Sequence, residues 1–161
     1  MTGAREVVEA LGMQPHPEGG WYAETWRASS PDGARPTGSA ILYLLSAGER
    51  SHWHRVDADE VWQYSGGDSL ELRVWAEGDP AVVTHRLGPG FAEAVTEGTK
   101  NAAVRAENAA VQVVVPAGAW QAARPLGAWT LVGCIVTPAF DFAGFELAPA
   151  GWEPPVGALP G

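Results

Sequence analysis

The sequence is organised around the stretch GERSHWHRVDADEVWQYSGG, residues 48–67. It places His52 and His54 two positions apart and begins a second apolar run at Glu60. Because a β-strand sends alternate side chains to opposite faces, we expect the two histidines to share one face. If the two runs pair across the intervening turn, two imidazoles and one carboxylate converge.

This combination of side chains favours a metal-binding or a catalytic site. Imidazole and carboxylate groups together suit a divalent transition metal such as Zn, Mn, Fe or Ni. They also suit general acid–base work, because histidine titrates near neutral pH. Trp62 and Tyr64 follow Glu60 at alternate positions, so they are predicted to lie on the same face and to line a pocket beside it.

Composition indicates a globular protein and excludes several classes of partner. The chain has 161 residues, of which 46% are hydrophobic and 18% charged, which fits one domain with a sizeable core. The formal net charge is −9 with only ten Lys and Arg residues, which argues against nucleic acid and against an anionic membrane surface. No apolar signal core or membrane-spanning run is visible, so we expect a cytoplasmic protein.

The rest of the chain reads as short strands separated by Gly/Pro turns. Residues 2–11 form a predicted amphipathic helix, and residues 91–108 have no clear pattern. The predicted strands outside the central stretch cover residues 21–27, 39–46, 69–75, 81–87, 109–115, 119–123, 129–137 and 140–147. This pattern predicts one all-β domain, a sandwich or barrel over residues 1–161, with an N-terminal helix in 1–12 and a surface tail in 148–161.

Two motifs resemble those of the cupin superfamily, whose members form a jelly-roll barrel, also called a double-stranded β-helix. The first motif is carried by Gly48, His52, His54, Glu60 and Gly67. The gap before its carboxylate is one residue longer than usual, which leaves Asp59 as a possible substitute. The second motif is carried by Pro116 and Gly118 and ends in Gln121, where the superfamily pattern has histidine.

The resemblance is closer to one RmlC-like cupin subfamily of largely unassigned function. It is carried by HPEGGWYAETWR at 16–27, VVVPAGAWQAA at 113–123 and LVGCIVTPAFDFAGFEL at 131–147, besides the central stretch. These segments together cover almost the whole chain. The resemblance also implies a homodimer, with which the extended arm of the first segment and the apolar run at 41–45 are consistent.

The resemblance implies two kinds of enzyme. In metal-binding cupins the corresponding residues hold one divalent ion, here His52, His54, Glu60 and Gln121, as in oxygenases and isomerases. In the metal-free, sugar-nucleotide epimerase-like branch, a histidine acts as base and a tyrosine as acid. His54 would then be the base, oriented by Asp57 or Glu60, with Tyr64 or Tyr43 as the proton donor.

The third interpretation is a binding protein, and it is the one we favour from the sequence. Small-molecule sites are mostly apolar pockets with a few polar groups. Here the predicted lining is Tyr43, Trp62, Tyr64, Gln121 and Phe140, with His52, His54 and Glu60 at the floor. The sequence therefore predicts a cupin that binds a small organic molecule in its barrel, with an enzyme of the two kinds above as the alternative.

Overall fold

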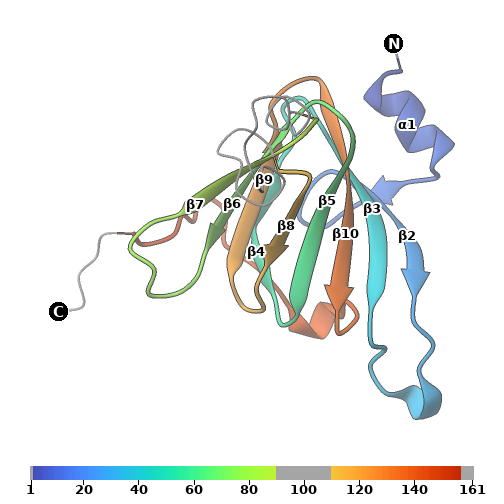
Figure 1. The fold of residues 1–161 in the computed structure, drawn as a ribbon, viewed down its shortest axis with the longest axis vertical. Coiled ribbons are helices and arrows are strands. Elements are labelled where there is room, and N and C mark those ends of the chain that lie inside the picture. Colours follow the sequence, from blue (N-terminus) through green and yellow to red (C-terminus); the bar gives the residue numbers. More distant parts are fainter. Residues whose placement is uncertain (1, 90–109, 157–161) are drawn as a thin grey trace, which may run out of the picture.

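The protein folds as two antiparallel sheets packed face to face, with one short helix at the N-terminal side (Figure 1). The computed structural model describes residues 2–89 and 110–156. The arrangement is that of a jelly roll, as the sequence predicts. None of the described helices is long and apolar enough to cross a membrane.

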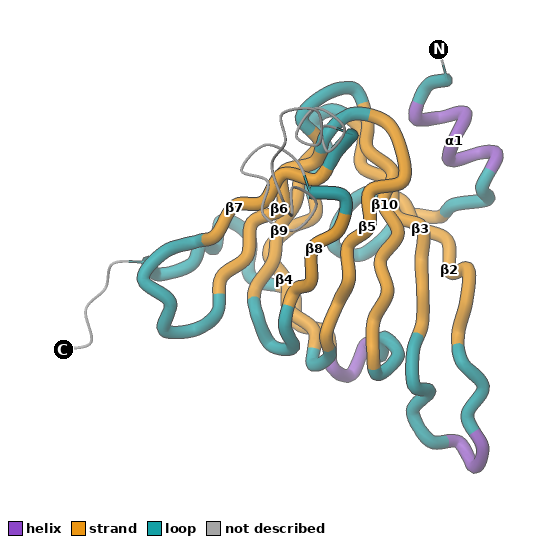
Figure 2. Tube along the Cα trace, viewed as in Figure 1, coloured by secondary structure: helices purple, strands orange, loops and turns teal. Residues whose placement is uncertain are grey.

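The strand order places distant parts of the chain side by side (Figure 2). The first sheet runs in the order β1 (Gln14–Pro15), β2 (Trp21–Arg27), β3 (Ser39–Ser46), β10 (Trp129–Thr137), β5 (Asp59–Gly67) and β8 (Gln112–Val115). The second runs in the order β11 (Phe145–Leu147), β4 (Ser51–Val56), β9 (Trp120–Pro125), β6 (Leu70–Trp75) and β7 (Val83–Leu87). The helix α1 covers Ala4–Ala10, and two short 3-10 turns cover Pro31–Gly33 and Phe142–Gly144.

Strand bounds agree best with the sequence where the apolar runs are long. The strands β3 and β10 have the predicted bounds, and they pair with each other along their whole length. The last predicted strand, residues 140–147, is wrong in its first half, because a 3-10 turn capped by the side chain of Asp141 occupies that part. The unpatterned stretch 91–108 lies outside the described residues.

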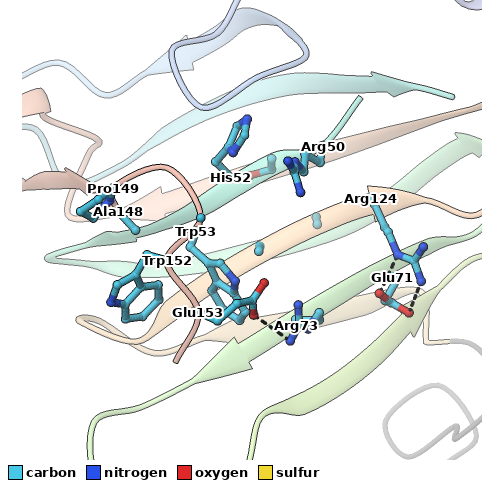
Figure 3. A pocket seen from close by; sticks show the side chains of 14 residues that line it. Arg50, His52, Trp53, Glu71, Arg73, Arg124, Ala148, Pro149, Trp152 and Glu153 are labelled. Atoms are coloured by element: carbon cyan, nitrogen blue, oxygen red, sulfur yellow. Dashed lines mark hydrogen bonds and ion pairs between the residues drawn. The ribbon is translucent and has the colours of Figure 1, made fainter. Parts of the chain in front are cut away.

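The outer face of the second sheet carries a cluster of four indole rings. Trp53, Trp75 and Trp120 lie on neighbouring strands, and Trp152 from the C-terminal segment packs onto them. Figure 3 shows Trp53 and Trp152 of this cluster. The ring centroids of Trp120 and Trp152 are 4.5 Å apart. The C-terminal segment is therefore held against the outer face of this sheet as far as Glu153.

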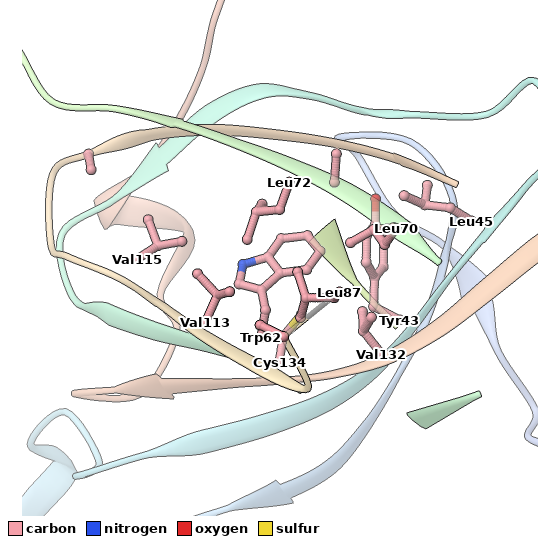
Figure 4. Packing of buried hydrophobic residues seen from close by; sticks show 13 residues of the cluster. Tyr43, Leu45, Trp62, Leu70, Leu72, Leu87, Val113, Val115, Val132 and Cys134 are labelled. Carbon is pink, nitrogen blue, oxygen red and sulfur yellow. The ribbon is translucent and has the colours of Figure 1, made fainter. Parts of the chain in front are cut away.

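The space between the sheets is filled at one end and hollow at the other. Trp62 lies fully buried among Leu72, Leu87 and Val113 at the filled end (Figure 4). At the other end of the same strand, Glu60 is buried but faces a cavity. Alternation along β5 therefore puts both side chains inside, while only one of them reaches the hollow part.

Candidate functional site

The hollow end of the barrel is a cavity of about 420 Å³. Its apolar lining is made of Tyr22, Ile41, Val56, Val136, Phe140 and Phe142. Its polar lining divides by burial: His16, Glu18, His54 and Glu60 lie at the inner end, whereas Glu24, Arg27, Arg35 and Asp141 are exposed at the mouth. An apolar wall with a few converging polar groups is typical of sites for small organic molecules.

The strand β4 brings His54 and Ser51 to the inner end, and it leaves His52 outside. The pairing of β4 with β9 is irregular between Ser51 and His54, so side chains three positions apart both point inward. His52 is exposed on the other side. The expectation that His52 and His54 share one face is therefore wrong, because the irregularity breaks the simple alternation on which it depends.

The segment before β2 supplies two further groups that the sequence did not single out as a site. The loop that carries His16 and Glu18 crosses the start of β4, where the His52 amide donates to the Glu18 carbonyl at 2.9 Å. Gly19 makes this approach possible, because its φ is +109° and a Cβ there would collide with the Arg50 carbonyl oxygen. The feature of the sequence that could have indicated this close approach is Glu18 directly before Gly19 and Gly20.

Hydrogen bonds assign the proton positions on His54. Its Nδ1 lies 2.8 Å from the His52 carbonyl oxygen, which only accepts, so Nδ1 carries the hydrogen. Its Nε2 lies 3.2 Å from Glu18 Oε2. Two bare acceptors would repel each other at that distance, so one proton is shared between the His54 ring and the Glu18 carboxyl. The hydroxyl of Ser51 donates to the other carboxyl oxygen at 3.0 Å.

Burial decides on which partner that proton lies. It raises the pKa of Glu18 and lowers the pKa of His54, because removal from water penalises the charged form of each. Both directions favour the neutral pair, in which the Glu18 hydroxyl donates to His54 Nε2. Burial also lowers the pKa of His16, whose Nδ1 accepts from the Glu18 amide at 3.2 Å.

Glu60 is held by a chain of side-chain hydrogen bonds that starts in the core. The indole N–H of Trp62 can only donate, and it donates to Gln121 Oε1 at 2.8 Å. This fixes the orientation of the Gln121 amide, so its Nε2 donates to Glu60 Oε2. The Cys134 thiol is a second hydrogen-bonding neighbour of the Glu60 carboxyl, and both residues line the cavity.

The environment of Glu60 brings its titration to neutral pH. Burial raises its pKa to about 7, against the attraction of His54 and the hydrogen bond from Gln121, which both lower it. A carboxyl with this pKa is half protonated under ordinary conditions and can act as acid or base. Cys134 lies beside it, and burial raises the pKa of that thiol well above its usual range, so it stays protonated.

The structure places the remaining predicted site residues in different parts of the molecule. Phe140 lines the cavity, and Gln121 lies behind Glu60. Trp62 and Tyr64 do not line it, which corrects the sequence prediction: Trp62 is in the core, and the Tyr64 hydroxyl donates to the Gly67 carbonyl near the far end of β5. Tyr43 is buried behind the cavity wall, where its hydroxyl donates to the Gly19 carbonyl at 2.6 Å.

The predicted set of four metal ligands is not assembled. His52 points away from the cavity, and both polar atoms of the Gln121 amide are engaged by Trp62 and Glu60. Within residues 2–89 and 110–156, no three side chains of His, Cys, Asp or Glu are grouped as metal ligands. These residues therefore do not fit the predicted four-ligand metal site, and the acids and bases of the cavity are Glu18, His54 and Glu60.

Two arginines at the mouth of the cavity hold neighbouring segments together by hydrogen bonds. The guanidinium of Arg27 donates to Glu24 and to the Phe140 carbonyl, the latter at 3.0 Å. Arg35 donates to both carboxylate oxygens of Asp57 and to the Ala139 carbonyl at 2.7 Å. The loop around residue 140, of which Phe140 lines the cavity, is thus held against the hairpin between β2 and β3.

Comparison with known proteins gives the family. The sequence profile described as "Cupin superfamily (DUF985)" matches residues 5–148. Protein SO0799 from Shewanella oneidensis is similar over 92% of this chain and 85% of its own, with 32% identity and a TM-score of 0.76. A hypothetical protein from Leishmania major is 27% identical over 91% of this chain and 88% of its own, with a TM-score of 0.73.

More distant structures share the fold alone. KdgF from Halomonas sp. is 16% identical over 81% of this chain and 91% of its own, with a TM-score of 0.53. No curated protein matches the sequence. The match over nearly the whole chain, together with the two packed sheets and the cavity between them, shows that the protein belongs to the DUF985 family of the cupin superfamily.

Proposed function

We propose that the cavity binds a small organic molecule and that Glu60 and the Glu18–His54 pair move protons on it, as an isomerase does. The observation that carries this proposal is that Glu60 and the uncharged Glu18–His54 pair converge at the inner end of a part-apolar cavity. Glu60 has a pKa of about 7, and Glu18 shares a proton with His54 over 3.2 Å. These buried groups with shifted pKa values converge on one cavity, which is typical of functional sites.

The two acid–base groups have complementary roles. In the ionised form Glu60, which lines the cavity, accepts a proton from the substrate on its carboxylate. The neutral Glu18–His54 pair returns one proton at a second position of the substrate, which leaves the Glu18 carboxylate and His54 Nε2 as two facing acceptors that favour uptake of a new proton. Proton exchange with water then resets both groups, so the cycle needs no other reactant. Such transfer by positioned side chains typically contributes about 10²–10⁴ to a rate.

The lining charges favour an uncharged ligand. Four carboxyl groups line the cavity, and the two arginines among its lining residues already pair with Glu24 and Asp57. An anionic ligand would meet no free cation among the described lining residues. We therefore expect a neutral molecule with a polar end toward Glu60 and an apolar part against Phe140.

The test uses hydrogen exchange, which needs no knowledge of the product. Neutral carbonyl compounds, including aldoses and ketoses, are incubated with the protein in D₂O. Sugar nucleotides are tested in the same way as anionic compounds. Proton NMR then follows replacement of C–H by C–D. Glu60→Gln and His54→Ala should abolish exchange, whereas Glu9→Gln on the exposed face of α1 should retain it.

Two outcomes contradict the proposal. One is exchange that persists at the full rate in Glu60→Gln, because that variant keeps the hydrogen-bonded shape but has no carboxyl to accept the proton. The other is stoichiometric metal in protein purified without a chelator or histidine tag, if the metal disappears in His54→Ala. That result would replace proton transfer by metal-assisted chemistry.

We also propose that two copies assemble through the outer face of the first sheet. Val114, Val61 and Ile135 are register neighbours on three adjacent strands, with Val114 55% and Ile135 40% exposed. An apolar row of this kind on a sheet face is a common dimer surface. Sedimentation at micromolar concentration should show a dimer that Ile135→Lys converts to monomer. A wild-type monomer would contradict this assembly.

A further inference from the structure

A second hollow lies on the outer face of the five-stranded sheet, across β4 from the cavity (Figure 3). It has a volume of about 150 Å³ and lies over β4, β6 and β9. The C-terminal segment 148–153 forms one wall, which is held by a 2.8 Å hydrogen bond from the Ala148 amide to the Trp53 carbonyl. We refer to this hollow as the outer groove.

The outer groove collects positive charge in an acidic protein. Three of the ten Lys and Arg residues line it, Arg50, Arg73 and Arg124, although the net charge is −9. Two of them have structural roles. Arg73 pairs with Glu153 at 3.1 Å and lies over the Trp53 ring, and Arg124 pairs with Glu71 at 2.8 Å.

Arg50 has no such role. Its side chain makes no hydrogen bond or ion pair with any side chain in the described parts of the chain. Arg50 and His52 are both exposed, and both are among the residues that line the groove (Figure 3). The two glutamates of the lining are each paired with another arginine, so neither of them pairs with Arg50.

We propose that the outer groove binds a small organic oxyanion, a carboxylate or a phosphate monoester. The guanidinium of Arg50 presents parallel N–H donors that match two oxygens of such a group, and His52 supplies a further donor. The apolar lining by Trp53 and Trp152 takes the organic part. A volume of about 150 Å³ has room for one such group in place of several water molecules.

The site is separate from the cavity and from its proposed chemistry. Ser51 and His54 point inward from β4, whereas His52 and Trp53 point outward. An anion in the groove therefore does not contact Glu60. A Glu60→Gln variant should bind the anion as the wild type does, so failure of the proton-transfer proposal leaves this one standing.

The experiment titrates the full chain with phenyl phosphate, benzoate and inorganic phosphate at low ionic strength, and calorimetry and tryptophan fluorescence report binding. Arg50→Gln should weaken binding roughly tenfold or more, which corresponds to loss of a charge-assisted hydrogen bond. Arg5→Gln is the matched control, since it removes the same charge from the exposed helix α1. Glu153→Gln should strengthen binding a few-fold, because it frees Arg73 for the anion.

Each outcome bears on the proposal. Saturable binding of phenyl phosphate supports a phosphate monoester, and saturable binding of benzoate alone supports a carboxylate. Tighter binding of phenyl phosphate than of inorganic phosphate supports the role of the indole rings. Equal effects of Arg50→Gln and Arg5→Gln would overturn the proposal, as would the absence of saturable binding of all three probes in the millimolar range.

Discussion

Replacing Glu60 by glutamine should change how the stability of the protein depends on pH. The folded protein raises the pKa of this carboxyl from its ordinary value of 4.5 to about 7, chiefly by burial. Between these two values the unfolded chain loses the proton while the folded protein keeps it. The free energy of unfolding therefore falls as pH rises through this window and levels off above about pH 7.

The size of the effect follows from the difference between the two pKa values. One pKa unit corresponds to about 1.4 kcal/mol, so the full loss is about 3 kcal/mol, of which roughly 2–3 kcal/mol falls between pH 5 and pH 8. Glutamine cannot ionise, and its amide oxygen can still accept the hydrogen bond from Gln121. Glu60→Gln should therefore be about as stable as the wild type at pH 5 and more stable by roughly 2–3 kcal/mol at pH 8.

Urea unfolding followed by tryptophan fluorescence at several pH values between 5 and 8 measures this difference directly. The control is Glu9→Gln, which removes an exposed carboxylate from α1 and should shift the whole curve without changing its shape. A difference between Glu60→Gln and wild type that stays constant with pH would refute the reasoning. So would a variant that is less stable than the wild type at pH 8.

Three further predictions test the hydrogen bonds and the close backbone contact that position the site residues. Long-range ¹H–¹⁵N NMR at pH 7 should show His54 as the neutral tautomer with its proton on Nδ1, and the opposite tautomer would contradict the proton assignment. Trp62→Phe should lower the free energy of unfolding by about 1–3 kcal/mol, because it leaves the Gln121 oxygen buried without a donor; a neutral effect in thermal unfolding would count against the hydrogen-bond chain. Gly19→Ala should cost more than about 2 kcal/mol, since its Cβ would collide with a carbonyl, whereas Gly12→Ala has only a positive φ to accommodate; equal losses in the two variants would contradict this.

The fold could be predicted from the sequence because its signals are local and repeated. The apolar runs of β3 and β10 fix their own length, and the Gly/Pro turns fix where the neighbouring strands begin. Alternation along β5 predicted Glu60 on an inner face but left Asp59 as a substitute, and the structure has Glu60 buried and Asp59 exposed. Alternation could not tell how far the hollow extends, because that depends on how many large side chains from both sheets fill the other end, and Trp62 is one of them.

The site itself is harder to predict, since it depends on contacts between distant segments. Glu18 meets Ser51 and His54 only because a loop more than thirty residues earlier crosses β4 (hydrogen bond to Ser51, sequence separation 33). No periodic pattern in the sequence predicts that this loop crosses β4. The irregular pairing of β4 is likewise set by its partner β9, so the inward and outward sides of His52 and His54 could not be read from their spacing.

The arginines at the mouth have a consequence for how a molecule enters. Arg27 and Arg35 already use their donors on Glu24, Asp57 and the carbonyls of the covering loop, so an incoming molecule gains little from them. These pairs are partly exposed, with side-chain accessibilities of 37% and 42% for one and 30% and 49% for the other, and such pairs weaken as dissolved salt screens them. If the cavity binds a neutral molecule as proposed, we therefore expect added salt to weaken these two ion pairs and to speed exchange of that molecule, with little change in its contacts to the buried carboxyl groups.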